Sequence, residues 1–550
     1  MALSILLSCL SSSLCLSPQP RSFRKVSVRE VRSSVEMQLA ELLDNDQDPS
    51  SSTARSRLGD IEAATWQTFQ ALPKNDLGRL PPPAVRYIVH NYFAKEHGWL
   101  ISGLEPQGHR PNATEVHDVS VLQDKAPALV EAFLEDRRSD RGLVLSDIVA
   151  MIAVLERFIV EESMTLLEAS YTLNGKSVHE DLDEDGLHEV LQSYLLIFAQ
   201  GHKASTNVTR HQAYKAVQNR NRPEVREYEH DAVLNYVYAN RHVTNPFVPR
   251  QYTLQAASEI VRDMAHRYGK WQNAECSLMK DHLIELDPTG FGRVPLSAFY
   301  AEDPRSVYHF SESVDYLRQT GALDESGLGG AKVLAANYML GPSNCIAVSD
   351  YYSVCCLNEC DSLMNELERQ VQAPAVAPER LLLLASQLSS ASVDAPRELP
   401  RLLVEKLHAI AALHGGQVPI HGRLFAQWLH YAFPFECPYP SLLKSAQSLT
   451  PSAWLEGGAT SDKEERKHHI STGSGASTTD AHTMPQWTDD EILPLHAPRR
   501  AVLDAARAVV LLAALLVAVR AALPAVRSAL HSMGLAEKKE GGDYVLPMRL

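Results

Sequence analysis

Apolar side chains recur at intervals of three and four residues through most of the middle of the chain, which is the spacing of a buried helix face. The pattern begins in residues 60–72 and is clearest in residues 143–173. One stripe of that second stretch consists of Ile148, Ile152, Leu155, Phe158 and Ile159. The spacing returns in residues 187–201 and in several later stretches, whereas the strict alternation of a half-buried strand is scarce. We therefore predict an all-α fold with a multi-helical globular body.

The C-terminal region carries an uninterrupted apolar run from Ala508 to Val519, which extends to Val526 with Arg520 and Pro524 as its interruptions. As a helix the clean run rises ~18 Å, and the extended run about 28 Å, against a hydrocarbon core of ~30 Å. We predict a single transmembrane helix within residues 501–530, with an amphipathic or buried helix as the alternative. Residues 454–500, rich in Gly, Ser, Thr and charge, are predicted to be a flexible linker to it.

The N-terminus is predicted to be a targeting leader, residues 1–35. An apolar run from Ala2 to Leu10 precedes small residues at cleavage spacing, which is typical of a secretory signal peptide. The following Ser-rich stretch is basic and reaches its first acidic residue at Glu30, which is typical of an organelle transit peptide. Signal and transit peptides together favour a plastid, and a signal alone favours the secretory route; a plain cytosolic tail is the third interpretation.

Composition and charge exclude several classes of function for this protein. The 550 residues are 45% hydrophobic and 22% charged, an ordinary composition for a folded protein. The formal net charge of -15 repels phosphate backbones, so we predict no nucleic-acid partner. The motifs GxxxxGK[ST], HExxH and GxSxG are absent from the sequence, which removes the most direct enzyme assignments.

Eight cysteines are present, and two of them, Cys9 and Cys15, lie in the leader. The remaining six allow up to three disulfides with fifteen possible pairings if the chain folds in an oxidising compartment. A reducing stroma or cytosol would leave them as thiols. Asn112 and Asn207 each begin an N-glycosylation sequon.

Two of these cysteine segments admit a chemical role. Cys356 and Cys360 stand one helical turn apart, but no second half-site for zinc follows, so buried thiols or disulfides are favoured over a structural metal. Cys345 lies in a loop just before a predicted helix, with several histidines downstream. A thiolate there is a candidate nucleophile for a cysteine-dependent enzyme.

Residues 286–300, LDPTGFGRVPLSAFY, have the order of a calcium-binding loop. Such a loop needs oxygen ligands at positions 1, 3 and 5, Gly at 6, a backbone carbonyl at 7 and a carboxylate at 12. From Asp287, position 3 is Thr289, position 5 is Phe291 and position 7 is Arg293. Phe291 and Arg293 offer only backbone oxygens, and position 12 is Ala298, which lacks a carboxylate. We predict a metal site at Asp287, Thr289, Phe291 and Arg293 that binds calcium weakly or has lost it.

A second copy begins at Asp324, 37 residues downstream of Asp287, since both loops read Leu-Asp-x-(Thr/Ser)-Gly-(Phe/Leu)-Gly. Its position 12 is Ala335. A third acidic stretch places Asp181, Asp183 and Asp185 at positions 1, 3 and 5, but its position 12 is Gln192. For the third stretch we favour an ordinary acidic helix N-terminus, which the helix dipole stabilises.

On these residues the segment 273–340 resembles a degenerate pair of the EF-hand family. The neighbouring segments LAANYMLGPSNC, YYSVCCLNECDSLMNELE and HGRLFAQWLHYAFPFECP are similar to those of algal EF-hand-domain membrane proteins, over most of residues 80–440. The resemblance implies calcium binding and brings no enzymatic activity with it.

The predicted organisation follows from these segments. After the leader come a disordered or short helical stretch (36–58), an N-terminal helical domain (59–272), the EF-hand-like pair (273–340) and a C-terminal helical domain (341–453), then the linker, the transmembrane segment and a tail (531–550). We predict a non-enzymatic, membrane-tethered protein with an interaction or calcium-linked regulatory role and an unidentified protein partner. The alternatives are an enzyme that uses Cys345 and a purely structural scaffold without calcium.

Overall fold

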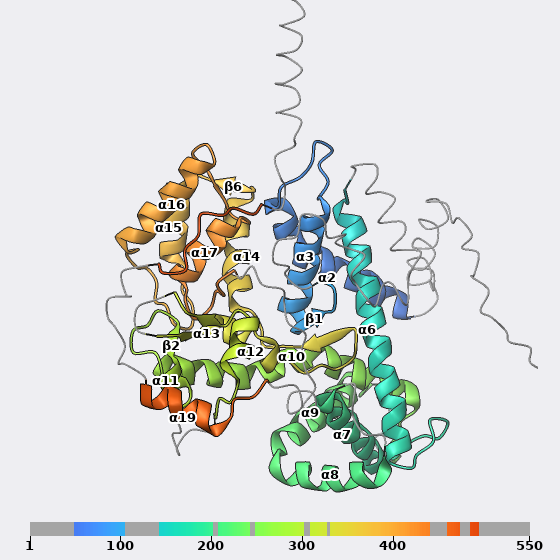
Figure 1. Cartoon of the computed structure of the whole chain (residues 1–550). Helices are drawn as coiled ribbons and strands as arrows, with labels where there is room; N and C mark the ends of the chain where they lie inside the picture. The colour runs from blue at the N-terminus through green and yellow to red at the C-terminus, as the bar shows by residue number, and fades with distance from the viewer. Residues whose placement is uncertain are drawn as a thin grey trace, which may run out of the picture. The chain divides into compact units, whose positions relative to one another are not determined.

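The computed structural model describes residues 49–104, 142–201, 207–242, 248–301, 308–326, 330–440, 459–472 and 484–493, with side chains from residue 56 onward. All of these residues belong to one compact unit (Figure 1). The predicted leader, Asn112, the predicted transmembrane segment at 501–530 and the tail lie outside the described residues.

Seven helices and one strand form the N-terminal part of this unit among the described residues. They are α2 (Pro49–Ala71), α3 (Pro82–His97), β1 (Trp99–Ile101), α6 (Leu145–Leu173), α7 (Glu184–Gln200), α8 (Val208–Asn221), α9 (Pro223–Ala239) and α10 (Leu254–Glu285). Local caps begin several of them: Asp183, Asn207 and Thr253 each accept a hydrogen bond from a backbone N–H of the first turn. The predicted stripe on α6, including Ile148, Ile152 and Leu155, is fully buried in the core of this part.

The EF-hand-like pair follows directly from the last turns of α10. It contains β2 (Arg293–Pro295), α11 (Leu296–Phe299), α12 (Val314–Gln319), β3 (Leu323–Asp324), β4 (Lys332–Leu334) and α13 (Ala335–Met339). The three strands form one antiparallel sheet in the order β2-β4-β3, with Val294 opposite Val333. A separate small core lies beneath this sheet, with Leu283 of α10 and Val294 both fully buried.

The C-terminal part has its own apolar core around Leu407, Phe425 and Trp428. Its elements are η1 (Pro342–Asn344), β5 (Tyr352–Val354), α14 (Glu359–Val371), β6 (Ala375–Val376), α15 (Pro378–Gln387), α16 (Arg401–Leu413), β7 (Val418–Pro419), α17 (Arg423–Ala432) and α19 (Lys463–Thr472). β5 pairs with β1, more than two hundred residues earlier, and β6 pairs with β7.

The long helix α10 links two of these parts. Its first half packs Ile260 and Met264 into the N-terminal core, and its last turns place Cys276 and Leu283 in the core of the EF-hand-like pair. It crosses the end of α3 closely at Gly269, where a Cβ would lie 2.0 Å from the carbonyl oxygen of His97. Only glycine permits this approach of two backbones.

The prediction of an all-α fold is wrong, because the described residues contain three small antiparallel sheets. Each strand is two or three residues long, too short to leave an alternating pattern in the sequence, and pairing across distant segments forms the sheets. No helix among the described residues is long and apolar enough to cross a membrane. The segment 501–530, where the transmembrane helix was predicted, lies outside those residues.

Two parts of the predicted linker, 454–500, are folded against the unit. Ser313 donates its backbone N–H to the carbonyl of Ala459 ahead of α19, and α19 packs on α11. Residues 484–493 lie along α17, where Gln427 donates to the carbonyl of Thr488. The apolar side chains of Met484 and Trp487, within an otherwise polar stretch, pack against the C-terminal core.

Candidate functional site

The first EF-hand-like loop uses both carboxylate oxygens of Asp287 internally. Asp287 is buried, and its Oδ1 accepts the backbone N–H of Thr289 at 3.0 Å. Its Oδ2 accepts the backbone N–H of Arg293, also at 3.0 Å. A carboxylate held in this way closes its loop through backbone hydrogen bonds. Thr289, the second predicted ligand, donates its own hydroxyl to Asp287 Oδ1.

The second loop repeats the arrangement at Asp324, which is also buried. Its Oδ1 accepts the backbone N–H of Ser326 at 2.9 Å. The strand register, however, shows that this loop is longer: Val294 is 294 − 287 = 7 residues after Asp287, and its partner Val333 is 333 − 324 = 9 residues after Asp324. Sequence counting places the closing position at Ala335, but the structural counterpart of Ala298 is Asn337, since 298 − 294 = 337 − 333 = 4.

Neither closing position supplies a carboxylate. Ala298 has no polar side chain, and Asn337 is buried with both ends of its amide in use. Its Nδ2 donates to the backbone carbonyl of Tyr439 at 2.9 Å, and its Oδ1 accepts the Tyr439 N–H at 2.7 Å. The position that closes the ligand shell of a calcium loop therefore ties the second loop to the segment after α17.

Arg293 supplies a buried positive charge to the paired loops. Its Nε donates to Asp324 Oδ2 at 2.8 Å, and the two side chains are 5% and 2% exposed. Its Nη1 donates to the carbonyl oxygen of Phe291 at 3.2 Å, one of the oxygens expected to bind calcium. Burial opposes ionisation of Asp324, but hydrogen bonds from Ser326 and Arg293 outweigh it and lower the Asp324 pKa. The guanidinium thus makes the charge contact that a cation would make.

The same guanidinium reaches the C-terminal part. Its Nη2 donates to the Tyr431 hydroxyl at 3.3 Å and to Gln486 Oε1 at 3.4 Å, and its carbon lies 5.0 Å from the centre of the Tyr431 ring. At Gly292, with φ of 68°, a Cβ would lie 2.4 Å from the carbonyl oxygen of Pro434. The loop expected to present its backbone to calcium is packed against the segment that follows α17.

The other acidic stretch is the start of a helix. Asp183 is the N-cap of α7 and accepts the backbone N–H of Gly186 at 2.8 Å. Asp181 and Asp185 are exposed on either side of it. This agrees with the interpretation of these residues as an acidic helix N-terminus.

All six cysteines of the body are paired in disulfides. The bonds join Cys276 to Cys356, Cys345 to Cys355 and Cys360 to Cys437. Cys345, the candidate nucleophile, is therefore a disulfide sulfur and offers no thiolate. Cys356 and Cys360, considered as zinc ligands, are likewise bonded to separate partners. The sequence allowed this state but could not select among the pairings.

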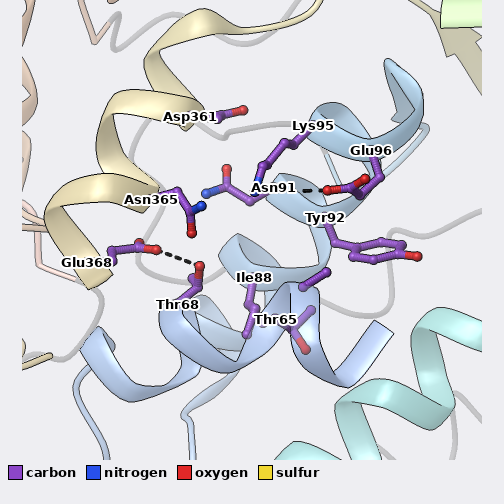
Figure 2. Close-up of a pocket in the computed structure, with 11 residues that line it drawn as sticks. Thr65, Thr68, Ile88, Asn91, Tyr92, Lys95, Glu96, Asp361, Asn365 and Glu368 are labelled. Carbon is purple, nitrogen blue, oxygen red and sulfur yellow. Dashed lines mark hydrogen bonds and ion pairs between the residues drawn. The ribbon is translucent and has the colours of Figure 1, made fainter. Parts of the chain in front are cut away.

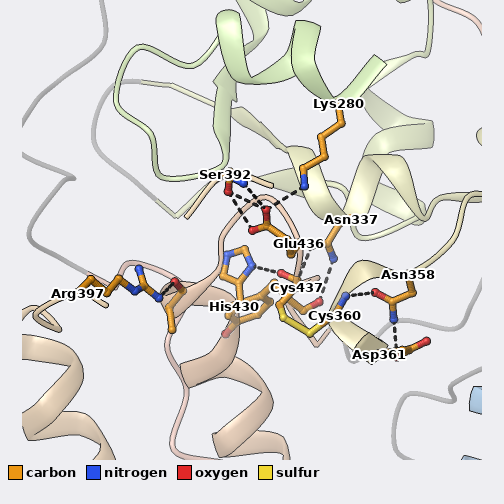
Figure 3. Close-up of a disulfide and its surroundings, with 12 residues drawn as sticks. Lys280, Asn337, Asn358, Cys360, Asp361, Ser392, Arg397, His430, Glu436 and Cys437 are labelled. Atoms are coloured by element: carbon orange, nitrogen blue, oxygen red, sulfur yellow. Dashed lines mark hydrogen bonds and ion pairs between the residues drawn. A yellow bond between two sulfur atoms is a disulfide. The ribbon is translucent and has the colours of Figure 1, made fainter. Parts of the chain in front are cut away.

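The Cys360–Cys437 disulfide lies beside a buried ion pair (Figure 3). Lys280 of α10 donates to Glu436 Oε1 at 2.9 Å, with side-chain exposures of 5% and 0%. The hydroxyl of Ser392 donates to the same Glu436 oxygen at 2.7 Å. These contacts connect α10, which leads into the EF-hand-like pair, to the C-terminal part through a buried ion pair.

A small polar pocket lies between α2, α3 and α14 (Figure 2). Its volume is about 350 Å³ including its mouth, and its polar lining includes Thr68, Asn91, Lys95, Asp361, Asn365 and Glu368. Both oxygens of Glu368 are engaged: Oε2 accepts the Thr68 hydroxyl at 2.5 Å, and Oε1 faces Nε2 of His421 at 2.9 Å. Among the described residues, Asp361 Oδ2 has no hydrogen-bond partner, so this oxygen is available to accept a hydrogen bond from a group bound in the pocket.

Burial raises the pKa of Asp361 to about 7, with a further contribution from the negative charge of Glu368, while Lys95 acts in the opposite direction. Between pH ~4 and 7 the folded chain therefore holds a proton that the unfolded chain has released. The contribution of this group to stability consequently falls as pH rises through that range. The pocket can thus bind a small polar group next to a carboxyl that changes charge near neutrality.

We expect Asp361→Asn to raise the free energy of unfolding at pH 8 by about 2 kcal/mol, because an amide removes the buried charge. At pH 4, where the carboxyl holds its proton in the folded chain and largely also in the unfolded chain, the variant and the wild-type chain should differ little. Urea denaturation across pH 4–8 measures both values. Asp394→Asn is the control, since Asp394 is exposed. If the free energy of unfolding of the wild-type chain, relative to that of the variant, increased with pH, the expectation would be contradicted.

Comparison of the chain with protein-family models, with curated proteins and with solved structures finds no match.

Proposed function

We propose that this chain is a non-enzymatic interaction protein in which the EF-hand-like pair is a calcium-independent structural joint. The observation that carries the proposal is the buried Arg293 guanidinium, which is bonded to Asp324 at 2.8 Å where a cation would otherwise balance the charge. The internal use of Asp287 and the replacement of both closing carboxylates support it.

The contacts of the joint favour a structural role. Arg293 reaches Tyr431 and Gln486, Asn337 reaches Tyr439, and Lys280 reaches Glu436, so three buried polar side chains of the joint bond to the C-terminal part. Regulation by calcium would require bonds from the ion to replace these contacts, and several buried hydrogen bonds would be lost.

Two further observations support an interaction protein of an oxidising compartment. The three disulfides are stable where thiols are oxidised, which fits export through the secretory route. Large apolar side chains are also exposed on the consecutive helices α8 and α9, where they offer apolar contact area to a protein partner. They are Val208, Tyr214, Val217, Leu234 and Tyr238.

Calorimetric titration of the full disulfide-bonded chain with calcium tests the joint. We expect no binding heat and no shift of Tm at millimolar calcium, because each loop already satisfies its carboxylate with protein donors. Magnesium at the same concentration controls for ionic strength. Saturable heat with a raised Tm in calcium alone, lost in Asp287→Asn, would contradict the proposal and support a calcium sensor.

A further inference from the structure

Four helices bring together a second cluster of charged and metal-ligating side chains, away from the EF-hand-like pair. It contains Arg57 of α2, His97 of α3, Glu156 of α6 and His266 of α10, with Tyr92 of α3 beside them. His97 and Glu156 are each 5% exposed, and His266 is half-buried. Their ligand atoms, one from each of His97, Glu156 and His266, lie within 4.8 Å of one another.

The orientation of His97 points its Nε2 into this cluster. Its Nδ1 lies 3.3 Å from the backbone carbonyl oxygen of His266, to which an Nδ1–H can donate. Its Nε2 lies 3.0 Å from Glu156 Oε1, a distance at which a proton on Nε2 is donated to the carboxylate. A metal bound at Nε2 replaces that proton and places its positive charge beside Glu156. An Nδ1–H bonded to a backbone carbonyl is also the usual support of a histidine that ligates metal through Nε2.

A nitrogen of Arg57 occupies the place of that cation. Arg57 Nη2 donates to the Tyr92 hydroxyl at 2.9 Å, lies 3.4 Å from His97 Nε2 and also bonds to Glu156 Oε1. It therefore meets a phenol oxygen, an imidazole nitrogen and a carboxylate oxygen at once, the surroundings of a coordinated ion. The Arg57 side chain is 40% exposed, so it can move outward without opening the core.

Aromatic rings form another wall of the cluster. Trp99 stacks on His97 with ring centres 4.3 Å apart, and its ring lies 5.4 Å from that of His266. Ligand atoms of one tetrahedral zinc ion lie about 3.4 Å apart. Two histidines and one glutamate leave a fourth position for water, a known zinc arrangement.

We propose that His97, Glu156 and His266 bind a divalent transition metal of the zinc class, which displaces Arg57 from the cluster. This site is separate from the EF-hand-like joint, so the two proposals stand or fall independently. The metal balances Glu156 in place of the guanidinium, and the released Arg57 extends into solvent.

The proposal is tested by calorimetric titration of the full disulfide-bonded chain with zinc chloride, and by the visible absorption of the cobalt(II) form. The leader cysteines are removed by Cys9→Ser and Cys15→Ser, since free thiols also bind zinc. We expect one zinc per chain. Glu156→Gln and His266→Ala should each weaken binding at least tenfold and change the cobalt spectrum. Arg57→Ala should tighten it by roughly tenfold, because the competing cation is gone.

Matched controls separate this site from general effects. Arg157→Ala removes the neighbouring arginine that pairs with Glu161 on the exposed side of α6, and it should leave zinc affinity unchanged. His408→Ala removes an exposed histidine and should also have no effect. His266 is half-buried, so its alanine variant should keep the fold, which circular dichroism of the metal-free chain verifies.

Three results would overturn the proposal. The first is the absence of zinc binding by the natural cluster. The second is binding that persists undiminished in both Glu156→Gln and His266→Ala. The third is binding that occurs only after Arg57 is removed, because the natural chain would then be closed by its own arginine.

Discussion

Arg293→Ala is expected to lower the free energy of unfolding by about 3–5 kcal/mol. The change leaves the carboxylate of Asp324, 2% exposed, without its counter-ion. It also removes the hydrogen bonds from the guanidinium to Phe291, Tyr431 and Gln486, which connect the first loop to the C-terminal part. Guanidinium chloride denaturation of the disulfide-bonded chain measures the loss.

Two variants test whether loss of the buried Arg293–Asp324 pair causes the loss of stability in Arg293→Ala. Arg318→Ala removes an exposed arginine of the same module that pairs with Glu325, and it should change stability little because water screens that pair. Arg293→Met with Asp324→Asn should recover more than half of the loss, since neither position then carries a buried charge. Millimolar calcium should not restore Arg293→Ala, because Ala298 and Asn337 supply no closing carboxylate. Full rescue by calcium would contradict the role assigned to Arg293.

Removal of the Cys360–Cys437 disulfide by a double change to alanine is expected to cost about 4.5 kcal/mol, from the entropy of the loop that it closes. The two cysteines are 77 residues apart, and the bond joins the start of α14 to the segment after α17. The bond also lies next to the buried Lys280–Glu436 pair, so its loss loosens the wall that excludes water from those charges. Chemical denaturation under non-reducing conditions measures the change.

The matched control is the double alanine variant of Cys345 and Cys355, which closes a loop of only 10 residues. Its expected cost is about 2.7 kcal/mol on the same entropic basis. An equal or larger loss for the short loop would show that unfolded-chain entropy does not govern the stability contributed by these bonds.

Much of the EF-hand-like module could be predicted from local residues. The repeated Leu-Asp-x-(Thr/Ser)-Gly pattern located both loops, which the pairing of Val294 with Val333 joins. Counting along the sequence failed in the second loop, because its two additional residues precede Val333 and no local signal shows where the strand resumes. Asn337 was therefore missed as the counterpart of Ala298.

Other features had no local signal. Arg293 was expected to contribute a backbone carbonyl, but its side chain lies between Asp324 and Tyr431, residues far from it in the sequence. The polar pocket joins Lys95 of α3 to Asp361 of α14, and the cluster proposed to bind metal takes single residues from separate helices. The sequence around a single histidine or glutamate in an apolar stripe does not show which residues of other helices will contact it.

The sequence by itself determined the helical stripes, the first turn of α7 at Asp183, and the two loop positions, because each depends on neighbours within a few residues. Tertiary structure alone decided the three sheets, the cysteine pairings and the partner of every buried charge. Short-range order follows from backbone geometry and side-chain spacing, which a linear chain displays directly. Charge pairing and disulfide bonding depend instead on which distant segments meet, and that is set by packing of the whole core.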